Sequence, residues 1–264
     1  MNRSYEGAVV VVTGASTGLG RAIAVGAAEL GARAVVINFA SSADEAETTA
    51  GLVRDAGAEA VLAQGNVALD EDCLRVAAAA GPYGRIDALF NNAGITRAAS
   101  YSKLERLSAD DFIDIYRVNV VGAFQMVRAA RSLLEASDIA AVVNISSIAG
   151  VTGGGSSIAY SASKGALNTM TKSLAGALAP KIRVNAVCPG FMDTPWFDKL
   201  GVNNARARVR ENMQATTPLK VASTPEDVAG SALFLGSAAA RHITGETLLV
   251  DAGLHLGAGN FAAR

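Results

Sequence analysis

Seven short apolar runs alternate with stretches of helical periodicity from one end of the chain to the other. The runs are residues 8–12, 34–39, 60–62, 88–90, 140–145, 184–187 and 247–250. Their apolar character is continuous rather than alternating, which is typical of parallel strands that are covered on both faces. The stretches between them are long enough to form crossover helices. The pattern therefore predicts an α/β fold, a Rossmann-type doubly wound parallel sheet of seven strands flanked by helices.

The composition narrows the possible classes of function. Lys and Arg number 23 and Asp and Glu 24, so the chain lacks the basic surface expected of a protein that binds nucleic acid or anionic lipid. No apolar run reaches the roughly 18–20 residues that span a bilayer. With two cysteines, two histidines and no close spacing of metal ligands, we expect a cytoplasmic protein without a metal site. No linker, charge block or repeat interrupts residues 1–264, which predicts one domain.

A glycine-rich turn follows the first apolar run. Residues 13–20 read TGASTGLG, with the glycines at the spacing G-x-x-x-G-x-G between a strand and a helix. Free backbone N–H groups and the helix dipole at such a turn favour a pyrophosphate, and glycine lets the backbone approach it closely. The alternative is a turn whose glycines serve only the close packing of helix on strand.

Further motifs follow this turn in a fixed order. They are NNAG at residues 91–94, Asn119 in a helical stretch, NISS at 144–147, YSASK at 160–164, and CPG at 188–190 with Thr194 after it. In order and spacing the chain resembles the short-chain dehydrogenase/reductase family, over about residues 7–257. The resemblance implies an oxidoreductase that transfers a hydride between a nicotinamide cofactor and a carbonyl or alcohol, similar to 3-oxoacyl reductases and glucose dehydrogenases.

Three residues match what reduction of a carbonyl requires. The carbonyl oxygen must gain a proton as the hydride arrives, so an acid and a hydrogen-bond donor must lie near it. Tyr160 and Lys164 are spaced i, i+4, which places them on one face of a helix, and the ammonium is expected to lower the pKa of the phenol. Ser147 ends an apolar run, where ligands bind in such sheets. An ordinary surface pair of Tyr and Lys is the alternative.

The family resemblance assigns a role to each of these side chains. It implies that Tyr160 is the general acid/base, that Ser147 orients the carbonyl, and that Lys164 tunes Tyr160 and holds the nicotinamide ribose. It also implies that Asn119 anchors a water in a proton relay, and a buried structural asparagine is the alternative. Ser146 is the alternative to Ser147, which we prefer because it lies thirteen residues before Tyr160, as in the family.

The resemblance also implies a set of residues that bind the cofactor. The expected set is Gly14, Ser16, Thr17, Gly18, Leu19, Gly20, Asn38, Ser41, Ser42, Asn66, Val67, Asn92, Ala93, Gly94, Tyr160, Lys164, Pro189, Gly190 and Thr194. Asn92 could instead tie strands together, and Thr194 could instead cap a helix. The chain departs from the family pattern at Asn66, where Asp is frequent, and at Ala252, where the family usually has Gly.

Residues near the end of the second apolar run bear on the choice of cofactor. NAD-specific relatives carry an acid at the position of Asn38, where it accepts hydrogen bonds from the ribose and repels a 2′-phosphate. Asn38 is neutral, and Ser41 and Ser42 could donate to a phosphate, but Thr17 stands where NADP-preferring relatives often have Arg or Lys. We predict that NADP(H) is preferred and NAD(H) usable, and that Asn38→Asp turns the preference toward NAD(H).

The resemblance implies a small carbonyl or alcohol compound as the substrate, and three functions fit the sequence. The first is an NADP-dependent reductase of ketones, or secondary-alcohol dehydrogenase. The runner-up is a 3-oxoacyl-[acyl-carrier-protein] reductase, for which Arg128 and Arg131 are candidates for a basic docking patch. The third is a non-catalytic NADP-binding sensor. A lid over residues 191–217 should shape the substrate pocket.

Residues of this lid and of a nearby loop suggest the kind of substrate. Met192, Trp196 and Phe197 favour an apolar or cyclic substrate, and three glycines at residues 153–155 suggest a roomy or flexible wall. We expect one or two short helices within residues 194–217, and a helix that begins at Thr224, where Thr-Pro-Glu-Asp is typical of a helix start.

A helix expected over residues 157–178 predicts self-association. Small side chains recur along it at Ala162, Ala166, Thr169 and Ser173, a stripe that permits close helix–helix approach. In the family this helix and the one that bears Asn119 meet another subunit. We therefore expect a homo-oligomer, specifically a tetramer.

Overall fold

The computed structural model describes residues 4–194 and 205–257. In these residues seven parallel strands form one sheet, in the order β3-β2-β1-β4-β5-β6-β7. The strands are β1 Val9–Val12, β2 Ala34–Phe39, β3 Glu59–Gln64, β4 Ala88–Asn91, β5 Ala141–Ile145, β6 Arg183–Pro189 and β7 Thr247–Val250. The order reverses direction between β1 and β4, which opens a crevice at the carboxyl ends of the strands. The predicted fold class and all seven strands are confirmed.

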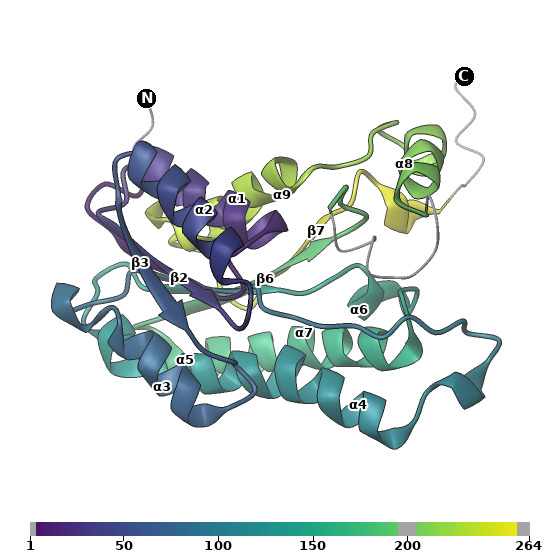
Figure 1. The fold of residues 1–264 in the computed structure, drawn as a ribbon, viewed down its shortest axis with the longest axis horizontal. Helices are drawn as coiled ribbons and strands as arrows, with labels where there is room; N and C mark the ends of the chain where they lie inside the picture. Colours follow the sequence, from purple (N-terminus) through teal and green to yellow (C-terminus); the bar gives the residue numbers. More distant parts are fainter. Residues whose placement is uncertain (1–3, 195–204, 258–264) are drawn as a thin grey trace.

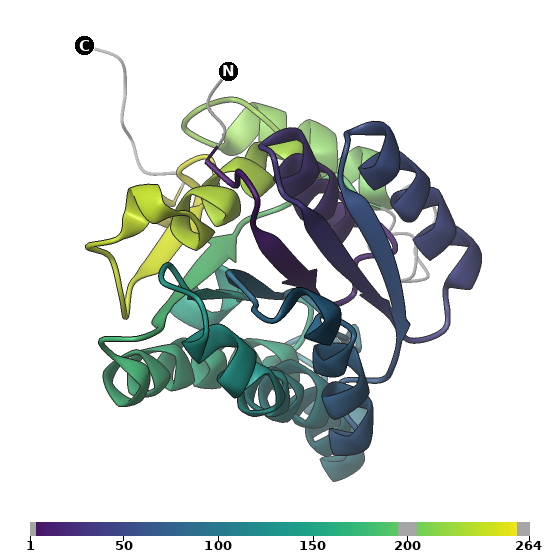
Figure 2. The same cartoon turned by 90° about the vertical axis from the view of Figure 1, so that its left-hand side faces the viewer.

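Helices cover both faces of the sheet (Figures 1 and 2). One face carries α1 (Gly18–Glu29), α2 (Ala43–Asp55) and α9 (Pro225–Gly236). The other carries α3 (Asp70–Ala78), α4 (Ala109–Tyr116), α5 (Ala123–Glu135) and α7 (Ile158–Leu178). A π-helical turn, η3 (Arg117–Gly122), joins α4 to α5, while α6 (Ala149–Thr152) precedes α7 and α8 (Ala205–Thr216) follows the gap in the described chain. Short 3₁₀ turns are η1 (Gly81–Tyr83), η2 (Leu104–Arg106), η5 (Ala238–Ala240) and η6 (Leu254–Leu256).

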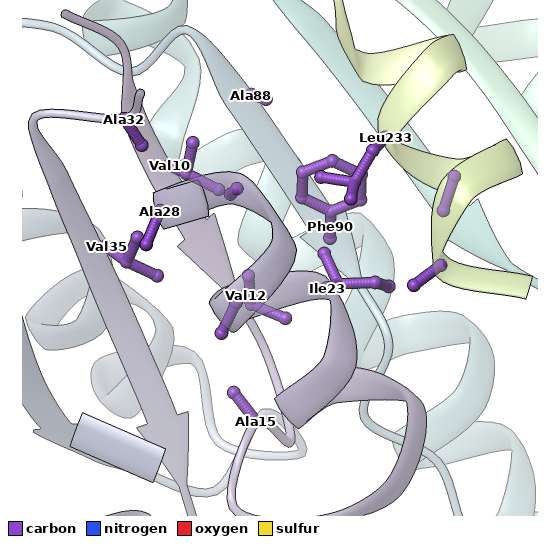
Figure 3. Packing of buried hydrophobic residues seen from close by; sticks show 14 of the residues in the cluster. Val10, Val12, Ala15, Ile23, Ala28, Ala32, Val35, Ala88, Phe90 and Leu233 are labelled. Carbon is purple, nitrogen blue, oxygen red and sulfur yellow. The ribbon is translucent and has the colours of Figure 1, made fainter. Parts of the chain in front are cut away.

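The two helical layers explain why the strands read as unbroken apolar runs. In β1, Val10 and Val12 point into the core beneath α1 and α9, whereas Val9 and Val11 point into the core of the opposite face. Figure 3 shows the first of these cores, in which Phe90 of β4 lies between Ile23 of α1 and Leu233 of α9. Every residue of β1 is therefore buried.

The helix start at Thr224 has the predicted chemistry. The Thr224 hydroxyl accepts a hydrogen bond from the Asp227 N–H, and the Asp227 carboxylate accepts one from the Thr224 N–H, which together form a capping box. Ser157 caps α7 by a single hydrogen bond, which its hydroxyl accepts from the Tyr160 N–H at 3.2 Å. Because this cap fixes the first turn of α7, it also fixes the backbone of Tyr160. The predicted helices that begin at Thr224 and span residues 157–178 are both confirmed.

Candidate active site

The glycine turn has the shape that a bound pyrophosphate requires. Gly14 and Gly18 have φ values of +60° and +56°, in the left-handed region that favours glycine. A Cβ at Gly20 would lie 2.4 Å from the Gly14 carbonyl oxygen, so no other residue fits there. Thr17 precedes α1 without a side-chain cap, and the first turn contains no acid. Its N–H groups have no helical partners, so the turn fits the phosphates of a dinucleotide.

Asn92 holds this turn against the sheet. Its side-chain amide donates to the carbonyls of Thr13 and Gly14, both at 2.9 Å, and the Thr13 hydroxyl accepts from the Ala93 N–H at 3.0 Å. Both donor hydrogens of the amide are thus used within the protein. The structure therefore gives Asn92 the strand-tying task that we considered as the alternative to cofactor contact, and it brings Ala93 beside the glycine turn.

The side chain of Asn38 is also held by hydrogen bonds within the protein, through both its amide nitrogen and its oxygen. The residue is 1% exposed, and its amide donates to the carbonyls of Ala63 at 3.1 Å and Gly65 at 2.9 Å. Its oxygen accepts from the Gly14 N–H at 3.3 Å. The side chain joins β2, the end of β3 and the glycine turn. This structural task was not predicted, because its partners lie 24 to 27 residues away in the chain. It is separate from the role in cofactor choice that we expected of Asn38.

The other residues expected around the adenosine differ in exposure. Ser41 is exposed and Ser42 precedes α2, while Asn66 is exposed and accepts from the Ala68 N–H. Val67 is buried, and a Cβ at Gly122 would lie 2.8 Å from its side chain. The structure thus brings Ser41 and Ser42 to the carboxyl end of β2, while Asn66 and Val67 follow β3.

Ser147, Tyr160 and Lys164 meet at the carboxyl end of β5. Tyr160 and Ser147 share a side-chain hydrogen bond, and the Ser147 hydroxyl also accepts from the Ala149 N–H at 3.1 Å. The Lys164 ammonium lies 5.7 Å from the centre of the Tyr160 ring and donates to the Ile145 carbonyl at 2.8 Å. Lys164 is buried, so the pair is not an ordinary surface pair.

Burial sets the protonation of the two groups on α7. It raises the pKa of Tyr160 to about 12, against the hydrogen bond from Ser147, which acts to lower it. It lowers the pKa of Lys164 to about 8. Burial, and not the charge of Lys164, therefore sets the pKa of Tyr160 in this arrangement, in which the ammonium donates to the Ile145 carbonyl. The lowering of the Tyr160 pKa by Lys164 stays a prediction. Tyr160 is a protonated phenol at neutral pH.

The structure separates the two candidate serines. The Ser146 hydroxyl donates to the Lys164 carbonyl at 3.1 Å, so it is turned toward the backbone of α7. Ser147 instead shares a hydrogen bond with Tyr160. Behind them lies the buried Cys188 thiol, whose pKa is raised by burial. The geometry thus favours Ser147 as the serine that reaches a substrate oxygen.

Asn119 lies in the π-helical turn η3, buried beside the site. Its oxygen accepts from the Ile95 N–H at 2.8 Å, and its amide donates to the Ile95 carbonyl and the Ser163 hydroxyl, both at 3.0 Å. A Cβ at Gly94 would lie 3.2 Å from the Asn119 oxygen and 3.7 Å from the Lys164 nitrogen. The side chain therefore has the structural role that we kept as an alternative, and it holds the NNAG loop against α7.

The end of β6 forms the wall opposite the glycine turn. A Cβ at Gly18 would lie 3.8 Å from the Thr194 methyl group, so Thr194 faces the start of α1. The Pro189 carbonyl accepts from the Ile148 N–H at 2.9 Å, and a Cβ at Gly190 would lie 2.7 Å from the Asp251 side chain. The structure thus places Pro189, Gly190 and Thr194 around the same crevice as the glycine turn.

Tyr101 restrains a loop that the sequence suggested to be flexible. Its hydroxyl lies 2.7 Å from the Gly153 carbonyl and from the Ser161 hydroxyl, and it accepts from the Gly155 N–H at 2.9 Å. A Cβ at Gly155 would also lie 2.7 Å from the Ala149 side chain. Close packing and hydrogen bonds therefore define this loop. Contacts more than fifty residues apart leave no local signal in the sequence, so Tyr101 was not predicted.

The expected lid is described only in part. The predicted helix is present as α8, and Asp193 binds it through Arg206 at 2.5 Å and Arg210 at 3.5 Å. Trp196 and Phe197, on which the expectation of an apolar substrate rests, lie outside the described residues. Met192 is partly buried and packs against the core of the α1 face.

Comparison with known proteins places this site in a family. A family model described as enoyl-(acyl carrier protein) reductase matches residues 14–255. The chain belongs to the short-chain dehydrogenase/reductase family. In a crystal structure named as a short-chain dehydrogenase/reductase of Burkholderia xenovorans, the similarity reaches a TM-score of 0.86 at 42% identity, over 95% of this chain and 98% of that one.

Curated members of the family also match nearly end to end. A protein named as ketoacyl reductase 2 of the granaticin polyketide synthase of Streptomyces violaceoruber is 40% identical, over 95% of this chain and 97% of its own length. The 3-oxoacyl-[acyl-carrier-protein] reductase FabG of Staphylococcus aureus is 34% identical, over 93% and 97%.

The chain is therefore an oxidoreductase that acts on CH–OH or ketone groups with a nicotinamide cofactor. Among the described residues, no helix has the length and apolar character to cross a membrane, and no three potential ligands form a metal cluster.

Proposed function

We propose that the protein is an NADPH-dependent reductase of a ketone, with Tyr160 as the acid that protonates the carbonyl oxygen. The hydrogen-bonded pair of Ser147 and Tyr160 beside the buried Lys164 is the observation that supports this function most directly. With a pKa of about 12, Tyr160 retains its proton at neutral pH, as an acid in the direction of reduction must.

The side chains divide the work as follows. When bound, the nicotinamide supplies the hydride that adds to the carbonyl carbon. The Ser147 hydroxyl donates to the carbonyl oxygen and orients it, and Tyr160 gives its proton to the same oxygen. The phenolate left on Tyr160 is stabilised by the positive charge of Lys164 in a site of low solvent exposure. The turn at Gly14–Gly20 would hold the cofactor phosphates, and Lys164 the nicotinamide ribose.

A 3-oxoacyl thioester is the more specific substrate class that we propose. The names of two relatives, a ketoacyl reductase and a 3-oxoacyl-[acyl-carrier-protein] reductase, support it. The docking patch that we expected for a carrier protein fits less well, because Arg128 pairs with Asp70 and Arg131 with Glu135. We therefore propose that the thioester itself, rather than an acidic carrier, determines recognition.

Loss of NADPH absorbance tests these functions side by side. The purified protein is given a 3-oxoacyl-N-acetylcysteamine thioester, the same acyl chain on coenzyme A, and a panel of simple and cyclic ketones. We expect turnover of both thioesters, with a kcat/KM at least tenfold above that of the simple ketones. If only the ketones are turned over, the protein is a general ketone reductase and a 3-oxoacyl thioester is not its substrate class. A protein that binds NADPH but reduces nothing would favour the sensor.

We also propose that a second copy of the chain covers the face formed by α4, η3 and α7. A groove of about 630 Å³ runs there between Ile113, Tyr116, Val121 and Ala162. Ile113 and Val121 are 51% and 44% exposed, and because both line this one groove they form an apolar patch that a partner could cover. The small-residue stripe that begins at Ala162 continues the groove along α7, and its side chains are partly or fully exposed. A tetramer would need a further contact.

Light scattering at micromolar concentration tests this assembly. The wild type should have the mass of a dimer or tetramer, and Ile113→Arg should lower it. Leu219→Arg, at a 69% exposed leucine outside the groove, is the control and should leave the mass unchanged. A monomeric wild type would refute the proposal.

Both cysteines, Cys73 and Cys188, are free and buried, which supports a reducing compartment, and we propose the cytoplasm.

A further inference from the structure

Arg21 connects the glycine turn to the start of α2. It follows directly after Gly20, in the first turn of α1. Its Nε donates to the Thr49 hydroxyl at 2.9 Å, and one terminal nitrogen donates to the Ser16 carbonyl at 2.6 Å and to the Glu45 carbonyl at 3.2 Å. The guanidinium therefore lies between the outer side of the glycine turn and the first turns of α2.

This position borders the place where the adenosine ribose must lie. The ribose binds at the carboxyl end of the second strand in folds of this kind, which here is followed by Ser41 and Ser42. Ser16, whose carbonyl accepts from Arg21, follows the carboxyl end of β1, which pairs in parallel with β2. The second terminal nitrogen of Arg21, Nη1, has no hydrogen-bond partner among residues 4–194 and 205–257. A donor and a full positive charge thus remain for a ligand.

On the condition that the proposed function is right, we propose that Arg21 recognises the 2′-phosphate of NADP(H). A guanidinium suits a phosphate because it is always charged and offers donors in a planar fork. Its charge would replace the one that the family often places at the position of Thr17. Asp44 and Glu45 lie in the first turn of α2 and oppose a phosphate, although neither forms an ion pair with Arg21 in the described residues.

A purely structural Arg21 predicts a different result. If the side chain only fastens the glycine turn to α2, its loss should weaken every adenine nucleotide to the same degree. If the charge of Arg21 binds the 2′-phosphate, its loss should weaken the binding of only those nucleotides that carry this phosphate. Two ligands that differ in this phosphate alone therefore separate the two roles, and they need no turnover.

Isothermal titration calorimetry with adenosine 2′,5′-bisphosphate and adenosine 5′-monophosphate measures this difference. Arg21→Gln removes the charge, and Arg21→Lys restores it without the fork. Arg33→Gln is the matched control, because Arg33 precedes the opposite end of β2 and stacks over Tyr83 at 5.3 Å. If Arg21→Gln does not fold, Arg21→Met, which keeps the aliphatic stem, takes its place.

We expect the wild type and Arg33→Gln to prefer the bisphosphate, and Arg21→Gln to lose about tenfold of that preference, which is about 1.4 kcal/mol. Binding of the monophosphate should stay within about twofold, and Arg21→Lys should recover part of the preference. An unchanged preference, or an equal loss for both ligands, would overturn the role of Arg21 alone. A wild type that binds neither nucleotide would overturn the proposed function as well.

Discussion

Replacement of Asn38 by aspartate should destabilise the protein, although it changes one atom of the side chain. The Asn38 amide is the donor to two buried carbonyls, those of Ala63 and Gly65. A carboxylate cannot donate, so both carbonyls lose their partner and face a negative charge. A buried polar group without its partner costs about 1–3 kcal/mol, so we expect a loss of about 3–5 kcal/mol, a large part of a typical free energy of unfolding.

The loss should depend on pH with a defined sign. Burial and the two carbonyls favour the neutral acid, so the pKa of the new carboxyl is higher in the folded state than its unfolded value of about 3.9. Between these two values the folded state binds more protons, and stability falls as pH rises. The destabilisation relative to wild type should therefore be larger at pH 8 than at pH 5. The difference is about 1.4 kcal/mol for each pH unit between 5 and 8 that lies below the pKa of the carboxyl in the folded state.

Urea unfolding followed by circular dichroism at both pH values measures these quantities. Asn212→Asp makes the same chemical change at an exposed site on α8 and should stay within about 0.5 kcal/mol of wild type. If Asn38→Asp is as stable as this control, the amide does not hold the carbonyls, and our reasoning about this position is wrong. The expected turn toward NAD(H) must be measured on folded protein, through kcat/KM for both cofactors.

Four further predictions concern the site and its surroundings. Tyr160→Phe should leave less than about a tenth of the wild-type turnover, with cofactor binding near normal. If more than a tenth of the turnover remains, the loss of transition-state stabilisation is under about 1.4 kcal/mol and Tyr160 is not the acid. Ser147→Ala should lower kcat more than Ser146→Ala, and the reverse order would exchange their roles. The kcat/KM of ketone reduction should fall as pH rises through about 8, where Lys164 loses its charge, and a limb near 10 would contradict this. Ala252 has a φ of +55°, so Ala252→Gly should raise Tm by about 2–4 °C in calorimetry, and an unchanged Tm would show that the strain is absent.

The fold could be predicted because burial on both faces leaves a direct trace in the sequence. The limits of β2 and β7 agree residue for residue with the apolar runs. The limits of β3 do not, since this strand continues through Glu59 and Gln64, whose side chains are exposed at the edge of the sheet. Polar ends of an edge strand look like loop in the sequence because no neighbour covers them.

The site could be predicted only where its geometry is local. The pair of Tyr160 and Lys164 needs only one helical turn, and the glycine turn needs only its own spacing. The contacts of Tyr101 and Asn38 join segments that meet through the tertiary fold, at separations of 24 to 60 residues. The pKa of Tyr160 could not be predicted either, because it depends on how far the site is buried, and a spacing of residues shows charge but not solvent exposure.

These contacts change how the choice of cofactor must be explained. The comparison of a neutral Asn38 with an acid assumed a side chain free to face the ribose, but the Asn38 amide already serves the backbone. Discrimination then depends on the charges that border the start of α2. In our proposal Arg21 favours a 2′-phosphate there, whereas the carboxylates of Asp44 and Glu45 would disfavour it. Because these carboxylates are exposed to screening water and the guanidinium is partly buried, attraction should exceed repulsion, which gives a modest preference for NADP(H).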